Sequence, residues 1–506
     1  MPSSIKHSPL DIIIVGAGIA GFAAAISCRR AGHHVEIYER SALNNELGAA
    51  IHVCPNASRG LLAWGLDPVQ AQFVTCKRSY RAHGSTLVRF HEGDDTYVTE
   101  KFGAPWFFAH RVDLHEELKR LATRQDGEGR PAVVHLKSEV TRYDTAAGSV
   151  SLSSGETVFG DLVIAADGVH TGSVEAILGS PNPALPTTDY NFAYRFLIPT
   201  EELAADPETV QFTEDDDGRV KFFVGEGRRL VWYPCRDNKV HNFVAIFHSD
   251  EQVYREDWQT HVETSALLET YSAFHPSLLA VLKKAKDVKQ WPLLFRAPIS
   301  SWHKEKLVAI GDAAHPMLPH QGQGGAQAIE DAVALGIALS GCTPANLDRR
   351  LKVFESVRMN RASVMQIFSI RSRGKMLTSN ADAGQDEPEK IRTDAAKFMP
   401  AETVPKTPEE FFAYNFGYDV VRDSVQAMQR EDASWELPAN FFERTPVAGV
   451  YPSLEREVDV DGDSIAKSRL LDSGNGGRHL VTYAADVYHS VVRQVWRILK
   501  SAQYLA

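Results

Sequence analysis

Residues 11–39 hold the pattern that most restricts how this chain can fold. Residues 11–15 are isoleucine and valine after one aspartate, which is typical of a buried strand. An alanine-rich segment, predicted as a helix to about Arg30, and a second apolar strand at residues 35–38 follow. Glycines with the spacing G-x-G-x-x-G join the first strand to the helix: Gly16, Gly18 and Gly21. Strand, glycine turn, helix and strand in this order predict an α/β fold with a parallel sheet.

The glycines and the end of the second strand have the residue types that bind a dinucleotide. Gly16 suits the tight turn, Gly18 lets a pyrophosphate approach the backbone, and Gly21 lets the helix pack on the strand. Glu39 can accept hydrogen bonds from both hydroxyls of a ribose. Because a carboxylate disfavours a phosphorylated ribose, the bound adenosine belongs to FAD or to NAD.

A second glycine-rich junction lies at residues 307–341. The apolar residues 307–310 predict a strand, and a loop with two prolines precedes a helix that runs to about residue 339. Asp312 follows the strand and can accept a hydrogen bond from a sugar or ribityl hydroxyl. Three glycines leave the helix N–H groups open to a flat, negatively charged ring: Gly322, Gly324 and Gly325. The alternative is a helix that only packs closely on a strand.

A third apolar strand, residues 162–166, ends in Asp167. Since parallel strands meet at one carboxyl edge, Gly16, Asp167 and Asp312 are expected to converge there. Small residues at 48–50, including Ala50, are candidates to face a ring system, or they belong to a simple βα connection. Arg111, at the start of an amphipathic helix, is a candidate phosphate ligand or an ordinary surface residue.

The residue pattern changes between residues 181 and 290, where alternating and aromatic-rich runs predict a mostly antiparallel sheet inserted into the cofactor domain. A long helix is expected at residues 346–377, and a polar linker at 375–410. Residues 411–428 are helical in character, and the amphipathic residues 487–499 are expected to dock on the body or on a dimer mate.

Composition excludes several classes of protein. The net charge of -11 over 506 residues argues against a general nucleic-acid binder. Five scattered cysteines indicate neither a disulfide framework nor a metal site, and a cytoplasmic protein is expected. No apolar run has the length of a membrane span.

Together, these motifs resemble those of the class A FAD-dependent aromatic monooxygenases, in particular the fungal salicylate hydroxylase-like enzymes. The resemblance rests on the glycine pattern with Glu39, on Asp167-Gly168, and on the run from Gly311 to Gly324 that includes Asp312 and His315. It implies an α/β, Rossmann-like FAD-binding domain of the para-hydroxybenzoate hydroxylase type, with an inserted antiparallel substrate domain and a helical C-terminal region. The implied divisions are 1–180 and 291–375 for the FAD domain, 181–290 for the substrate domain, and 376–506 for a linker and helical extension.

The resemblance also implies roles for individual residues. Glu39, Arg40 and the first three glycines (Gly16, Gly18 and Gly21) would hold the ADP half of FAD. Arg111 and Asp167 would serve the pyrophosphate side, and Asp312 the ribityl chain. The isoalloxazine would lie against residues 319–325 and near Ala50, with Pro319, Gly322, Gly324 and Gly325 in contact. No metal is implied.

By the same resemblance, NADH or NADPH is the co-substrate that reduces the flavin. Reduced flavin and O2 would form a C4a-hydroperoxide that hydroxylates a small phenolic or other electron-rich aromatic, with or without decarboxylation, in a monomer or homodimer. At residues 169–174 the chain departs from the family pattern, because Val174 stands where an arginine is usual. The nicotinamide contact therefore does not carry over.

Two residues on predicted strands of the inserted sheet are the candidate catalytic residues. Cationic Arg195 would favour an ionised phenol, and Tyr233 would donate a hydrogen bond to it. Both also fit as purely structural strand residues. His315 and His320 are interpreted as structural.

Three other functions remain open. The first is a tailoring monooxygenase that epoxidises or dearomatises a larger secondary metabolite. The second is a flavin reductase or oxidase, which would insert no oxygen. The third is a non-enzymatic module that holds FAD as a structural element.

Overall fold

The computed structural model describes residues 8–43, 49–187, 190–214, 216–250, 260–370 and 386–447. The predicted helix at residues 487–499 and the small residue Gly48 lie outside these ranges. Within them, no helix combines the length and the apolar character that crossing a membrane requires.

The βαβ unit predicted from the glycine pattern is confirmed, and it belongs to a six-stranded sheet with the order β21-β22-β12-β1-β2-β8. Five strands are parallel, and only β21 runs antiparallel to its neighbour. The predicted strands at 162–166 and 307–310 are β12 and β22 and lie side by side. The bounds are β1 Asp11–Val15, β2 His34–Glu39, β8 Val133–Leu136, β12 Leu162–Ala165, β21 His303–Lys304 and β22 Leu307–Ala309.

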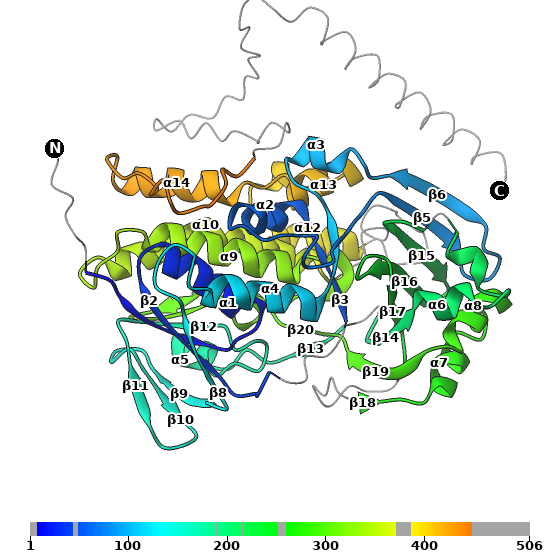
Figure 1. Ribbon diagram of the computed structural model, residues 1–506, viewed down its shortest axis with the longest axis horizontal. Helices are drawn as coiled ribbons and strands as arrows, with labels where there is room; N and C mark the ends of the chain where they lie inside the picture. Colours follow the sequence, from blue (N-terminus) through cyan, green and yellow to red (C-terminus); the bar gives the residue numbers. More distant parts are fainter. Residues whose placement is uncertain are drawn as a thin grey trace, which may run out of the picture. The chain divides into compact units, whose positions relative to one another are not determined.

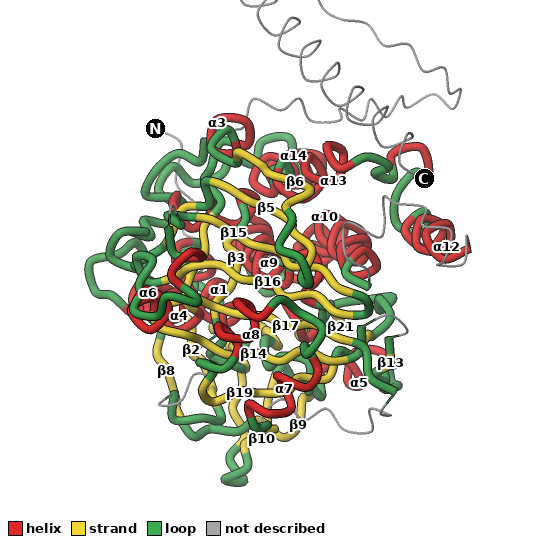
Figure 2. The backbone as a smooth tube through the Cα atoms, turned by 90° about the vertical axis from the view of Figure 1, so that its right-hand side faces the viewer, coloured by secondary structure: helices red, strands yellow, loops and turns green. Residues whose placement is uncertain are grey.

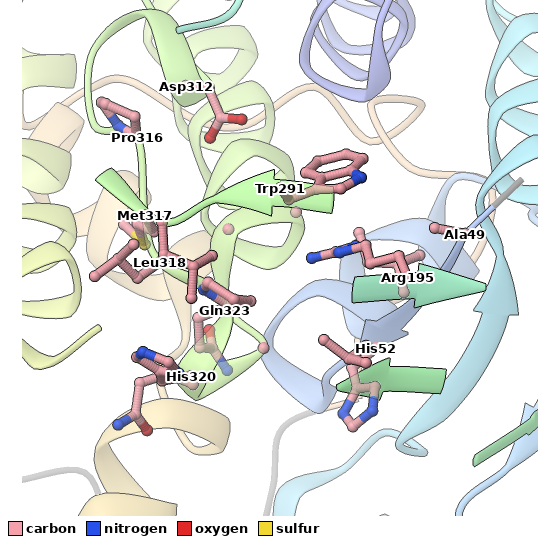
Figure 3. Close-up of a pocket in the computed structure, with 18 of the residues that line it drawn as sticks. Ala49, His52, Arg195, Trp291, Asp312, Pro316, Met317, Leu318, His320 and Gln323 are labelled. Carbon is pink, nitrogen blue, oxygen red and sulfur yellow. The ribbon is translucent and has the colours of Figure 1, made fainter. Parts of the chain in front are cut away.

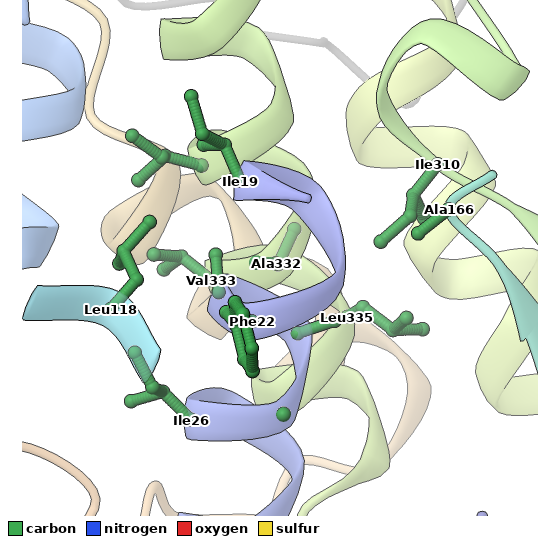
Figure 4. Packing of buried hydrophobic residues seen from close by; sticks show 14 of the residues in the cluster. Ile19, Phe22, Ile26, Leu118, Ala166, Ile310, Ala332, Val333 and Leu335 are labelled. Atoms are coloured by element: carbon green, nitrogen blue, oxygen red, sulfur yellow. The ribbon is translucent and has the colours of Figure 1, made fainter. Parts of the chain in front are cut away.

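Helices α1 (Ile19–Arg30), α4 (Arg111–Thr123), α9 (Gly324–Leu339) and α10 (Leu347–Phe368) accompany this sheet (Figure 1). Figure 4 shows Phe22 of α1 among Ala332, Val333 and Leu335 of α9. The two helices approach so closely at Gly336 that a Cβ there would lie 1.9 Å from the Ser27 hydroxyl. This contact explains the alanine and glycine content of both helices.

The predicted antiparallel sheet is also confirmed, with eight strands in the order β18-β19-β14-β17-β16-β15-β5-β6. Figure 2 shows the strands from β6 to β19 side by side in this order. All neighbours are antiparallel except β15 and β5. The bounds are β5 Arg78–His83, β6 Arg89–Asp94, β14 Phe192–Pro199, β15 Arg219–Gly225, β16 Arg228–Cys235, β17 Val240–Phe247, β18 Thr260–His261 and β19 Lys286–Pro292.

The sheet takes in residues that the sequence reading assigned elsewhere. Strands β5 and β6 come from the first part of the FAD domain, outside residues 181–290, and pair with β15. One face of the sheet is covered by α7 (Thr264–Thr270) and α8 (Pro276–Leu282), which bury a second apolar core. The other face is left for the site described below. A short helix and a 3-10 turn also follow β14: α6 Thr200–Ala204 and η1 Val210–Phe212.

Smaller elements complete the frame. A three-stranded sheet has the order β3-β7-β4, another has β11-β10-β9, and β13 pairs with β20. Their bounds are β3 Ala50–Val53, β4 Val74–Thr75, β7 Phe107–His110, β9 Val140–Asp144, β10 Ser149–Leu152, β11 Thr157–Phe159, β13 Leu185–Pro186 and β20 Leu294–Phe295. The short helices beside them are α2 Pro55–Ala63, α3 Val98–Phe102 and α5 Ser173–Leu178.

Three local expectations differ from the structure. Ala50, considered as part of a βα connection, begins strand β3, where it pairs with His110 of β7 and its N–H donates to Asn242. Helix α10 ends at Phe368, not near residue 377. The expected polar linker contains α12 (Asp386–Ala395), whose Ile391 packs with Phe368 and Phe411. Helices α13 (Pro408–Phe416) and α14 (Val420–Glu431) follow, separated at Gly417.

Candidate active site

The carboxyl edge of the six-stranded sheet and the open face of the eight-stranded sheet enclose a cavity of 1210 Å³. Most of the predicted site residues line it, although they come from distant parts of the chain: Gly18, Arg40, Ala50, Arg111, Asp167, Arg195, Tyr233, Asp312, Pro319, Gly322, Gly324 and Gly325. Gly16, Gly21 and Glu39 are not among the residues that line it. The predicted convergence of three strand ends is therefore present in the structure.

The glycine turn after β1 is shaped by the contacts of its own backbone. Gly16 has φ 98°, which favours glycine, and a Cβ at Gly21 would lie 1.9 Å from the Gly16 carbonyl oxygen. At Gly18 a Cβ would meet nothing within 4 Å, because this residue faces the cavity. Glu39 accepts hydrogen bonds from the N–H groups of Ala17 and Ser41, both at 2.8 Å. Its carboxylate is thus held against the turn.

Asp167 is anchored by a residue that the sequence reading missed. The Tyr143 hydroxyl, on β9, donates to Asp167 at 2.6 Å. Burial raises the pKa of Asp167, while the hydrogen bond from Tyr143 lowers it. No sequence motif marks Tyr143.

The turn that carries Asp312 is fixed from behind by Asp331 of α9. The Asp331 carboxylate accepts from the Gly311 N–H at 2.9 Å and contacts His315 Nε2 at 2.6 Å. His315 is 1 % exposed and does not line the cavity, so this geometry fits the structural interpretation. The Asp312 side chain itself points into the cavity (Figure 3). Burial raises the pKa of Asp312, against the opposing fields of His315 and Arg111.

A fully buried network extends from Asp331 to the start of α9. Arg358 of α10 donates to Asp331 at 2.9 Å and also pairs with Glu330. Asn56 bridges Glu330 and Gln323, and Gln323 lines the cavity. The same cluster therefore holds both the turn that carries Asp312 and the glycine-rich start of α9 in place.

Arg195 of β14 lies in the other half of the cavity. Its guanidinium lies 4.5 Å from the ring of Trp291 on β19, and Figure 3 shows the two side chains together, across from Leu318 and Gln323. Arg195 makes no hydrogen bond or ion pair with any described residue. Burial lowers the pKa of Arg195, while Tyr233 raises it and Arg111 lowers it.

Tyr233 has a different partner from the one expected. Its hydroxyl donates to the Ala50 carbonyl at 3.0 Å, and the residue is 4 % exposed. The donor that was expected to reach a ligand therefore holds β3 against β16. A nearby pair was also missed by the sequence reading: Arg229 donates to His320 Nδ1 at 3.1 Å, and both line the cavity.

Comparison with known proteins decides the family. A family model described as FAD binding domain matches residues 110–367, and one described as NAD(P)-binding Rossmann-like domain matches residues 14–50. The FAD-dependent monooxygenase cfoG of Aspergillus candidus is 42 % identical over 447 residues, which cover 87 % of this chain and 100 % of that protein.

This chain belongs to the FAD-dependent monooxygenases. The hispidin-3-hydroxylase of Neonothopanus nambi is similar to this monooxygenase at 31 % identity, over 71 % of this chain and 87 % of that protein. A structure of a salicylate hydroxylase substrate complex shares the fold with a TM-score of 0.65 at 22 % identity, covering 83 % of this chain and 98 % of that one. The predicted family, fold class, FAD cofactor and enzyme class are confirmed.

The cavity of the monooxygenase fits FAD. The backbone is bare at Gly18 and at Gly324, where a Cβ would meet nothing within 4 Å. The first N–H groups of α1 and α9 have no acceptor within their own helices and adjoin the same space. When bound, FAD accepts a hydride from NADH or NADPH and, once reduced, activates O2 for transfer of one oxygen atom to the substrate.

Proposed function

We propose that this monooxygenase hydroxylates an acidic phenol or aryl acid, which it binds as an anion against Arg195. The observation that carries the proposal is a half-buried guanidinium that faces the cavity and makes no ion pair with a described residue. A cation that has lost part of its hydration and has no counter-ion is costly, so a ligand that supplies the negative charge is favoured.

The charges around Arg195 support this choice. The acidic residues in the cavity lining are Asp167 and Asp312, both in the half that fits FAD. The half next to Arg195 adds the further cations Arg81 and Arg229. Such a field stabilises a phenolate over a phenol and raises the electron density of its ring, which the transferred oxygen requires.

The walls beside Arg195 serve to exclude water. Val231, Val244 and Ile246 lie on one side, and Leu293 and Leu318 close the other. In the balanced reaction, one atom of O2 is inserted into a ring C–H bond and the other leaves as water, whose two electrons and two hydrogens come from NAD(P)H and one proton. Exclusion of bulk water by this apolar wall favours transfer to the ring over release of peroxide.

Tyr233 is assigned a positioning role in this proposal. Because its hydroxyl donates a hydrogen bond to the Ala50 carbonyl, Tyr233 fixes the distance between the eight-stranded sheet and strand β3, which faces the space for the flavin. A Tyr233→Phe variant should therefore keep its selectivity for anions and lose coupling, which is seen as a larger share of peroxide per NAD(P)H consumed.

The test is oxidation of NADH and NADPH by the FAD-loaded enzyme, with phenols and salicylates and their uncharged methyl ethers. Arg195→Gln should raise KM for acidic substrates about tenfold or more, as expected for loss of a charge-assisted hydrogen bond of about 1.5–3 kcal/mol. Arg195→Lys should retain part of the binding. Arg228→Gln is the matched control, because Arg228 is the first residue of β16 and does not line the cavity. Equal KM values for phenols and their ethers in the parent enzyme would contradict the proposal.

A second candidate is a tailoring monooxygenase that acts on a larger metabolite. The observation that favours it is the extent of the cavity, which reaches from Arg195 past β16 to Phe90 on the outer strand β6. Incorporation of labelled oxygen from O2 would separate both candidates from an oxidase. Low peroxide release with multi-ring compounds, together with high release with single rings, would favour the tailoring enzyme.

A further inference from the structure

Five side chains from five neighbouring strands form one row across the floor of the cavity. The register pairs Arg195 of β14 with Val244, Val244 with Val231, Val231 with Phe222, and Phe222 with Arg81 of β5. All five line the cavity. Residues in register on adjacent strands point to the same face of a sheet. The row is therefore apolar in its middle and cationic at both ends.

The row is long compared with a single aromatic ring. Neighbouring strands lie about 4.8 Å apart, so the four steps from β14 to β5 separate the Cα atoms of Arg195 and Arg81 by roughly 19 Å. The Arg195 guanidinium lies 4.5 Å from the ring of Trp291 on β19, which borders β14 on the side away from Arg81. Because Arg195 is thus directed away from the row, a ligand of one ring cannot touch both guanidinium groups. A ligand of two or more connected rings can.

Arg81 resembles Arg195 in its surroundings. It makes no hydrogen bond or ion pair with a described residue, and its guanidinium lies 5.8 Å from the Phe222 ring. Burial lowers the pKa of Arg81, and no carboxylate counteracts that effect. Beside it, Phe90 is 51 % exposed and lines the outer end of the cavity. The outer end thus offers a cation and two aromatic faces.

The third arginine of this face is differently placed. Arg229 lies two residues from Val231 on β16, and it donates to His320 at 3.1 Å. Because arginine is always a donor, His320 Nδ1 must be the acceptor, so Arg229 fixes the side chain next to the flavin loop. Arg81 has no such partner among the described residues.

We propose that Arg81 is a specificity-determining residue that binds a second acidic group at the far end of an elongated substrate. The inference rests on the proposed function, in which the reacting ring carries its own anion against Arg195. The substrate class is an extended aromatic of two or more connected rings with a phenolate, enolate or carboxylate at each end. The apolar residues Val244, Val231 and Phe222 contact the rings between.

The experiment compares two ligands with the same ring framework on the FAD-loaded enzyme: a para-hydroxystilbene, and the same compound with a carboxylate on the far ring. Dissociation constants come from the change in flavin absorbance, and KM and kcat come from NAD(P)H oxidation. The parent enzyme should bind the carboxylated compound about tenfold more tightly, which corresponds to about 1.4 kcal/mol.

Arg81→Gln should abolish that difference by weakening the binding of the carboxylated compound only. Arg81→Lys should keep part of it. Arg89→Gln, on the adjacent strand β6 and outside the cavity lining, removes the same charge and should change neither constant.

Three results would overturn the inference: no preference of the parent enzyme for the carboxylated compound, an equal effect of Arg81→Gln on both compounds, or an equal effect of Arg89→Gln. The proposed function fails separately, if Arg195→Gln leaves the binding of both phenols unchanged. If Arg195→Gln weakened binding and Arg81→Gln did not, the proposed function would stand and only the inference of a second acidic group would fail.

Discussion

Two glycines can separate cofactor binding from folding. Gly18 and Gly324 have ordinary backbone angles, and a Cβ at either would meet nothing within 4 Å of protein. We expect Gly18→Ala to leave the melting temperature of the apoprotein within a few degrees of the parent and to weaken FAD binding at least tenfold, because the methyl group takes space that the cofactor needs. Fluorescence titration with FAD and thermal unfolding of the apoprotein measure the two effects.

Gly21→Ala is the contrasting variant. Its Cβ would lie 1.9 Å from the Gly16 carbonyl oxygen, so α1 must move away from the turn. This variant should lose apoprotein stability as well as FAD affinity. If Gly18→Ala destabilised the apoprotein as much as Gly21→Ala, the turn at Gly18 would not open toward the cofactor.

At the level of elements, the contact between α9 and α10 depends on buried charges. Arg358 pairs with both Glu330 and Asp331, and all three side chains are 0 % exposed. We expect Arg358→Ala to reduce the free energy of unfolding by about 3–5 kcal/mol, because two buried carboxylates would lose the cation that they share, leaving Glu330 with Arg361 and Asp331 with His315. Chemical denaturation of the apoprotein measures the loss, and flavin release should accompany it.

Lys352→Ala on the same helix is the matched control. Lys352 pairs with Asp348 at 2.7 Å, but both side chains are 65 % exposed. The expected loss is below about 1 kcal/mol. Comparable losses in the two variants would mean that the charge network does not support the flavin segments.

Local sequence patterns predicted individual strands and helices better than they predicted which strands pair with each other. The glycine spacing with its second strand and the apolar runs at residues 11–15, 162–166 and 307–310 were sufficient to predict β1, β2, β12 and β22, because buried parallel strands are marked by continuous apolar runs. They did not predict β21 of the same sheet. Strand β6 has six mostly exposed residues, so no alternation marks it, and its place in the eight-stranded sheet depends on a pairing distant in sequence.

The site shows the same division. Cofactor-side residues such as Asp167 and Asp312 follow strand ends and could be predicted from position. The donor of Asp167, Tyr143, and the acceptor of Tyr233, Ala50, could not, because these contacts join strands of different sheets. Strand register is also what places Arg81 and Arg195 in one row, and register is not visible in a single sequence.

For the whole molecule, buried histidines make stability depend on pH. Burial, together with Lys221, lowers the pKa of His241 well below its usual value. This direction holds although Asp216 Oδ2 lies 3.5 Å from His241 Nε2, because Asp216 also pairs with Lys221. Below about pH 6.5, His241 therefore binds a proton in the unfolded chain but stays neutral in the folded chain. Stability should be complete above about pH 6.5 and fall below it, by up to about 1.4 kcal/mol per pH unit for this one group.

Urea unfolding of the apoprotein at pH 7.5, 6.5 and 5.5 tests this dependence, where the pH values are roughly one unit either side of an unperturbed histidine. His241→Gln should flatten the decline between the two lower values. His261→Gln, an exposed histidine on β18, should not. An unchanged slope in His241→Gln would show that other groups control the acid sensitivity.

The parallel pairing of β5 with β15 has a consequence during synthesis of the chain. Arg78 pairs in register with Arg219, so 141 residues must be translated after Arg78 before its partner exists. At roughly 5–20 residues per second, Arg78 is synthesised about 7–28 s before its partner. A nascent chain halted before residue 219 should carry an open strand edge, and chaperones that bind such edges should associate with it until β15 emerges.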